Sequence, residues 1–202
     1  MELVEKCLLP TVPKPFHWFN EPAKYNLGAG LEIVTNEKTD FWQNTYYGFQ
    51  RDDGHCLLTE QSGDFVLMTK VEFRPQEKYD QCGLMVRGDG GNWIKVSTEY
   101  EGRERSRLGS VVTNLGYSDW ATQDIPSSHT QMWYRVSKNG SDFLLESSYN
   151  GQDWAQLLIA HLHRPFEQLE VGMYACSPIG KDFWCRFNVL AISKNEWFFR
   201  AG

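Results

Sequence analysis

Long apolar runs, an excess of positive charge and closely spaced cysteines are all missing from this sequence of 202 residues. No stretch approaches the roughly 18 apolar residues of a membrane-spanning helix. The first ten residues carry two Glu and no long apolar run, unlike a signal peptide. Twenty Lys and Arg stand against 26 Asp and Glu, which gives a net charge of -6. We therefore expect neither nucleic acid nor a membrane as a partner, because both attract clustered cations.

Cysteine is also scarce, and the five cysteines are Cys7, Cys56, Cys82, Cys176 and Cys185. Their number is odd and no two of them have CxxC spacing, which argues against a zinc clip and a disulfide framework. Reduced thiols are typical of a cytoplasmic protein. His161 and His163 would place two imidazoles on one strand face, with His129 as an unanchored third, but exposed histidines on an edge strand explain them as well. We expect no metal site and no cofactor.

Aromatic residues are plentiful, at 14% of the chain with eight Trp, which is typical of sheet proteins. Apolar and polar residues alternate almost everywhere from residue 30 onward, whereas the helical period is nearly absent. Asn139-Gly140 and Asn150-Gly151 lie between alternating runs and predict hairpin turns. The expected strands include 65–73, 81–87, 93–100, 132–136, 143–149, 169–176 and 183–190. Many short strands without intervening helices predict an all-β sandwich of two sheets.

Four blocks of this sequence resemble one family. They are "TDFW" (39–42), "YDQCGLMVRGDGGNWIKVSTEYEG" (79–102), "LGSVVTNLGYSDW" (108–120) and "VGMYACSPIGKDFWCRFNVLAI" (171–192). The family is a domain of unknown function in the concanavalin A-like lectin/glucanase superfamily, and some of its members carry the name "regulation of enolase protein". The resemblance spans roughly Phe16 to Phe198.

The resemblance implies a concanavalin A-like jelly-roll sandwich of two antiparallel sheets, one of them curved into a concave face. In that superfamily the concave groove often holds a carbohydrate, although no reaction is established for this family. We expect one such domain over residues 16–202, preceded by an N-terminal extension over residues 1–15.

Strand alternation predicts which side chains would line the groove. If Ile94 and Val96 pack between the sheets, their neighbours point out of the opposite face. An exposed indole there could stack on the apolar face of a sugar ring while charged groups bind its hydroxyls. The predicted ligand-binding residues are Gln81, Arg87, Trp93, Lys95, Glu99 and, at the rim, Trp120.

The same residues also have structural interpretations. Glu99 could form a cross-strand ion pair with Lys95 or Arg87 on a face that loops cover. The sequence of residues 116–120 predicts a loop after a strand that contains Val111. Trp120 could then pack over the end of the sandwich without contacting a ligand.

A glycoside hydrolase is a further alternative, with Glu99 as its catalytic carboxylate. Hydrolysis needs two carboxyl groups about 5–9.5 Å apart. The side chains of Glu99 and Glu101 should point to opposite faces of a strand. Pairing of Glu99 with Asp119 or Glu72 is possible, but nothing in the sequence fixes their distance. We therefore predict a binding protein without a catalytic residue.

A regulatory protein that binds a metabolic enzyme is the third hypothesis, suggested by the name that some family members carry. The aromatic segments 16–19 and 195–200 could contact such a protein partner, although packing against the sandwich explains both segments too.

Overall fold

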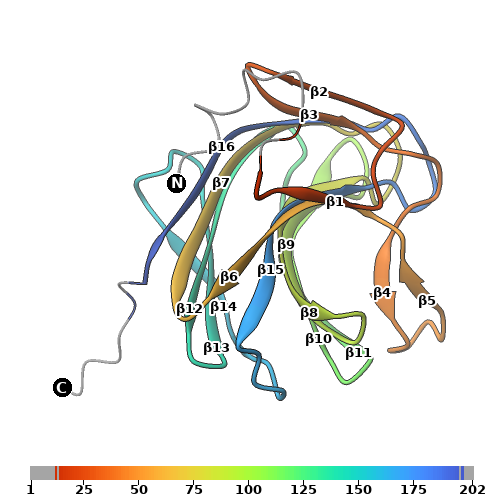
Figure 1. Cartoon of the computed structure of the whole chain (residues 1–202). Coiled ribbons are helices and arrows are strands. Elements are labelled where there is room, and N and C mark those ends of the chain that lie inside the picture. Colours follow the sequence, from red (N-terminus) through yellow and green to blue (C-terminus); the bar gives the residue numbers. More distant parts are fainter. Residues whose placement is uncertain (1–11, 13, 196, 198–202) are drawn as a thin grey trace.

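The computed structural model describes residues 12, 14–195 and 197 (Figure 1). In this part of the chain, strands form two seven-stranded antiparallel sheets and one separate hairpin. The two sheets stack as a sandwich, which confirms the all-β fold expected from the sequence (Figure 1). No helix long and apolar enough to cross a membrane occurs in the described residues.

We call the first sheet the groove sheet. In spatial order it consists of β1 (His17–Phe19), β6 (His55–Ser62), β15 (Gln168–Cys176), β8 (Gln81–Asp89), β9 (Asn92–Tyr100), β10 (Arg105–Asn114) and β11 (Tyr117–Pro126). The second is the back sheet. It consists of β14 (Ala155–His161), β13 (Asp142–Ser148), β12 (Gln131–Asn139), β7 (Phe65–Arg74), β16 (Trp184–Lys194), β3 (Gly30–Val34) and β2 (Lys24–Gly28).

The main core fills the space between the two sheets, as the alternation in the sequence requires. In β7, Phe65, Leu67, Thr69, Val71 and Phe73 are buried and their neighbours point outward. The buried hydroxyl of Thr69 donates to a backbone carbonyl of β16 at 2.6 Å, so its polar atom is satisfied inside the core. The alternating run of the sequence is thus the inner face of a back-sheet strand.

The sequence predicts the turns at the two Asn-Gly pairs correctly, but it misplaces the turn near residues 116–120. Gly140 connects β12 to β13 with φ +60°, and Gly151 follows β13 with φ +76°, as tight turns require. The loop expected at 116–120 is wrong. The turn lies at Leu115 and Gly116, whose φ angles are 51° and 81°, and the strand β11 already begins at Tyr117.

The third element is a short hairpin of β4 (Phe41–Gln43) and β5 (Gln50–Asp52), which we call the cap hairpin. It faces the concave side of the groove sheet, where β8, β9 and β10 bend toward it (Figure 1). A second buried cluster fills the space between them. Its members are Phe41, Trp42, Cys56, Leu58, Met85, Trp93, Val111, Tyr174 and Cys176.

Both ends of the domain pack against the sandwich. Phe16 belongs to the main core, and the ring of Trp18 lies 5.0 Å from that of Tyr25. At the other end, the backbone carbonyl of Trp197 accepts from Asn139 and Asn195. Most of the aromatic segment 195–200 lies outside the described residues, as does Cys7. The other four cysteines are free and buried.

Candidate functional site

Strand register places the predicted groove residues on one face of the groove sheet. Gln81 lies opposite Glu99, which in turn lies opposite Arg107. Two rows further along, Lys95 lies opposite Val111, and Val111 lies opposite Trp120. Because side chains at every second residue share a face, these side chains all lie on the concave side.

A pocket of about 420 Å³ opens on this side between the sheet and the cap hairpin. Its lining includes Gln81, Lys95, Glu99 and Trp120, four of the six predicted ligand-binding residues. Residues from the cap hairpin and its flanks line another part of the pocket: Asp40, Trp42, Tyr47, Phe49 and Arg51. We call the part of the face that lines the pocket the open half, and the part around Arg87 and Trp93 the closed half.

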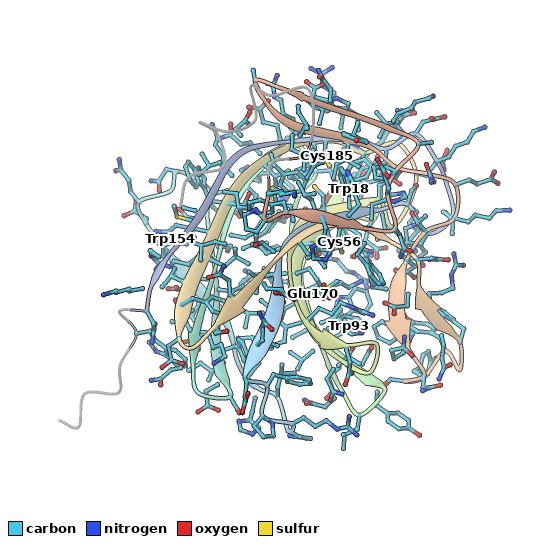
Figure 2. The ribbon with its side chains drawn as sticks, viewed as in Figure 1. Trp18, Cys56, Trp93, Trp154, Glu170 and Cys185 are labelled. Carbon is cyan, nitrogen blue, oxygen red and sulfur yellow. The ribbon has the colours of Figure 1, made fainter. Side chains whose placement is uncertain are left out.

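The prediction of an exposed indole at Trp93 is wrong. Trp93 lies on the concave side as expected, between the groove sheet and the cap hairpin (Figure 2), but none of its surface is exposed. Its ring centroid lies 6.2 Å from that of Phe41 in the cap hairpin. Alternation identifies the face of a strand correctly, but it carries no information about a distant hairpin that covers that face. Trp93 is therefore a core residue of the second cluster.

Arg87, a second predicted ligand-binding residue, lies outside the pocket for a related reason. Its guanidinium forms two hydrogen bonds to the carboxylate of Asp52 in β5, at 2.9 and 2.7 Å. It also lies 4.4 Å from the ring of Phe19. Arg87 is buried and outside the pocket lining. Its charge holds the cap hairpin against β8 instead of facing a ligand.

Aromatic side chains form one wall of the open half. Trp120 contacts Trp42 edge to face with centroids 6.5 Å apart, and Trp42 contacts Tyr47 at 5.4 Å. Tyr47 stacks with Phe49 at 5.9 Å. The sequence predicts only Trp120 among these residues. The short block that contains Trp42 is visible in the sequence, but nothing in it shows that the cap hairpin folds back over the sheet.

Polar side chains form the floor of the pocket. The amide of Gln81 donates to Glu99 Oε2 at 2.8 Å, and Tyr174 donates its hydroxyl to Gln81 Oε1 at 3.0 Å. The ammonium of Lys95 donates to the backbone carbonyl of Phe41 at 2.9 Å. Glu99 is therefore bound by an amide, and the ion pair with Lys95 or Arg87 that the sequence allows does not form.

The carboxyl group of Glu99 has unusual electrostatics. Its burial raises its pKa to about 7, an effect that the positive charge of Lys95 opposes and the negative charge of Asp40 increases. Its Oε1 atom is buried without a hydrogen-bond partner among the described residues. Perturbed carboxyl groups that lie in a pocket are typical of functional sites.

Neither of the second carboxylates considered from the sequence accompanies Glu99. Glu72 lies on β7 in the back sheet, where it binds Arg186 at 2.7 Å. Asp119 lies opposite Val112, whose side chain belongs to the main core, so Asp119 and Glu99 are on different faces. Glu101 forms ion pairs at 3.2 and 3.3 Å with Lys78 and Arg107.

The histidines considered as metal ligands are separate from the pocket. Nδ1 of His161 lies 2.6 Å from Asp142, and the ring of His163 lies 5.8 Å from that of His161. His129 lies beside Tyr149 instead, at 4.6 Å. Among the described residues there is no group of three His, Cys, Asp or Glu side chains placed to hold a metal ion.

Comparison with known proteins gives a family, a relative and structural neighbours. The family described as "Protein of unknown function (DUF1349)" matches residues 18–195. "Regulation of enolase protein 1" of Saccharomyces cerevisiae is 36% identical over 162 residues, which cover 80% of each chain. The crystal structure of a functionally unknown protein from Saccharomyces cerevisiae superposes with a TM-score of 0.83 at 32% identity, covering 89% of this chain and 96% of that one.

A more distant solved structure is that of Bacteroides ovatus Xyloglucan PUL GH43B. It superposes with a TM-score of 0.72 at 16% identity, and the match covers 92% of this chain and 38% of that one. At this level of identity the likeness concerns the fold alone.

Proposed function

The chain belongs to the DUF1349 family of proteins of unknown function, and we propose that its open half binds a carbohydrate without cleaving it. The observation that carries this proposal is an aromatic wall facing a polar floor across one pocket. Trp42 and Trp120 provide apolar surface, and Gln81 and Glu99 provide hydrogen-bonding groups opposite them. A pyranose ring has the matching chemistry, since it has an apolar C–H face and hydroxyl groups around its edge.

Binding fits the carboxylates of the pocket better than hydrolysis does. A glycosidase holds an acid and a second carboxylate on either side of the bond that it cleaves. Of the carboxylates that line this pocket, Asp40 accepts from the backbone amide of Phe41 and lies 3.9 Å from the ammonium of Lys95. Asp40 thus already has structural partners. Glu99 then supplies the hydrogen-bonding carboxyl group at the pocket floor.

Calorimetric titration with neutral cello- and xylo-oligosaccharides tests the proposal. We expect saturable binding and no shorter products in the same samples. Trp120→Ala should weaken binding about tenfold or more, because the stacking surface is lost. Trp133→Ala on the back sheet removes another partly exposed tryptophan and should leave binding unchanged. If no sugar binds the unmodified protein, or if shorter products accumulate, the proposal is wrong.

A protein partner is the second candidate, supported by the name of the yeast relative. Exposed apolar side chains surround the mouth of the pocket, including Tyr47, Phe49 and Ile179, and they could serve as contacts. Purified enolase is the probe that this name suggests. Binding of enolase together with a failure of every sugar would favour this candidate, and the double variant Tyr47→Ala/Phe49→Ala should then weaken the complex.

A further inference from the structure

The aromatic side chains of the open half continue beyond the pocket. Centroid distances of 6.5, 5.4 and 5.1 Å link Trp120 to Trp42, Trp42 to Tyr47, and Tyr47 to Tyr46. Exposure increases along this row, from 8% at Trp42 to 53% at Tyr47 and 93% at Tyr46. The row therefore leads from the wall of the pocket to the surface of the cap hairpin.

The turn that carries Tyr46 has a defined conformation. Asn44, Tyr46 and Gly48 have φ angles of 52°, 62° and 71°, and only Tyr46 among them has a bulky side chain that disfavours this region. Backbone hydrogen bonds close the turn, including one from Gly48 to Asn44 at 2.8 Å. A bulky residue in this conformation is costly, and such strain is typical of sites with a function. Here it presents an aromatic ring to solvent.

The cations around the pocket already have partners in the protein. Arg107 lies 3.3 Å from Glu101, Lys95 lies 3.9 Å from Asp40, and Arg51 binds Asp53 at 2.7 Å. A phosphate or carboxylate on the ligand would need a cation that is free to bind it. Among the described lining residues there is none, so the pocket favours an uncharged ligand.

From these observations we infer that the ligand is a neutral oligosaccharide chain rather than a single sugar or an acidic one. One unit lies in the pocket beside Gln81 and Glu99, and the following units stack along Trp42, Tyr47 and Tyr46. This inference rests on the proposed carbohydrate binding and specifies the length and charge of the ligand.

The test is a length series of xylose, xylobiose, xylotetraose and xylohexaose, together with the same cello-oligosaccharide series, titrated by calorimetry. We expect affinity to increase at least about tenfold from the disaccharide to the hexasaccharide in the series that binds, because further rings reach the cap hairpin. Xylotetraose substituted with glucuronic acid should bind no more tightly than xylotetraose itself.

The variant Tyr46→Asn isolates the outer end of the row. Asn tolerates the left-handed backbone, so the turn keeps its shape while the ring is removed. We expect about a tenfold loss of affinity for the hexasaccharide and none for the disaccharide, and Tyr46→Phe should retain both affinities. Tyr149→Asn is the matched control, because Tyr149 is an exposed tyrosine after β13 at the other sheet.

The outcomes separate this inference from the proposed function. Equal affinity for short and long sugars, or tighter binding of the acidic sugar, would overturn the inference and leave carbohydrate binding in place. A hexasaccharide affinity that Tyr46→Asn does not change would also overturn it. Failure of every sugar to bind would overturn the proposed function itself.

Discussion

The two halves of the concave face share the same strands and the same alternation, yet the cap hairpin covers one and leaves the other open. In the closed half, Trp93 is completely buried and Arg87 is paired with Asp52. In the open half, Trp120 is partly exposed, and Glu99 has a buried oxygen without a partner among the described residues. One face of a sheet can thus contain a second core and a binding site side by side.

The difference shows what the closed half does for the open half. Arg87 and Lys95 fasten the cap hairpin at two places, through Asp52 and through the carbonyl of Phe41. The same hairpin carries Trp42 into the pocket wall and Tyr47 beside it. The closed half therefore fixes the position of aromatic residues that the open half uses. Variants in the closed half should therefore lower stability, and those that loosen the cap hairpin should lower sugar affinity as well, whereas variants in the open half should change sugar affinity without a loss of stability.

The largest expected effect on stability belongs to Trp93. Trp93→Ala would leave a cavity in the second cluster and should lower the free energy of unfolding by about 3–5 kcal/mol. Denaturation in urea measures this loss. Trp93→Phe keeps most of the volume and should cost less. Unchanged stability together with a loss of sugar binding in Trp93→Ala would contradict this assignment to the closed half, because Trp93 would then behave as a residue of the open half.

The next effect concerns the attachment of the cap hairpin. Asp52→Ala removes both acceptors of Arg87 and leaves a buried guanidinium without its partner. Because Asp52 is itself partly exposed, we expect a loss of about 2–3 kcal/mol, at the lower end for buried ion pairs. Sugar affinity should also fall, because the hairpin carries Trp42, Tyr47 and Phe49 of the aromatic wall.

The control for this variant is Asp52→Asn, which keeps one acceptor and the shape of the side chain. It should recover part of both losses, as measured by urea denaturation and by calorimetry. If Asp52→Ala lowered stability and left sugar affinity intact, the hairpin would not need its attachment to Arg87 in β8 to form the pocket wall.

The fold was predictable from the sequence because its signal is local. Alternation in β7 and the Asn-Gly turn at Gly140 each involve a few neighbouring residues, and both are found as expected. The error at 116–120 has a local cause as well. Both Leu115 and Gly116 adopt positive φ, which allows a two-residue turn where the sequence suggested a longer loop.

The site was only partly predictable, because its cover is not local. Alternation correctly put Lys95, Glu99 and Trp93 on one face. Trp93 is covered because Phe41 packs against it. Phe41 lies more than 50 residues before Trp93 in the sequence, and only the tertiary fold brings the two rings together. For the same reason Trp42, Tyr47 and Phe49 were missed as pocket residues. A block of aromatic residues in a short hairpin was the one signal available.

The smallest of these expected effects on stability is a gain in the open half, from Glu99→Gln. The folded protein holds the pKa of Glu99 near 7, above its ordinary value of 4.5, because the carboxyl group is buried. Folded protein therefore binds more protons than unfolded protein between these values. The stability contributed by the neutral carboxyl is complete below about pH 4.5 and is lost as the pH rises through about 7.

Glutamine is neutral at every pH and should remove this loss. We expect Glu99→Gln to be more stable than the unmodified protein by about 1–3 kcal/mol at pH 8, and to differ little at pH 5. Urea denaturation at both pH values measures the difference, and Glu104→Gln, at an exposed glutamate, should change stability little at either. A loss of sugar affinity in Glu99→Gln alongside this gain would mean that the open half keeps a destabilising carboxylate for its ligand. Equal stability at pH 8 would mean that Glu99 is solvated, and the two halves would then differ in cover but not in electrostatic cost.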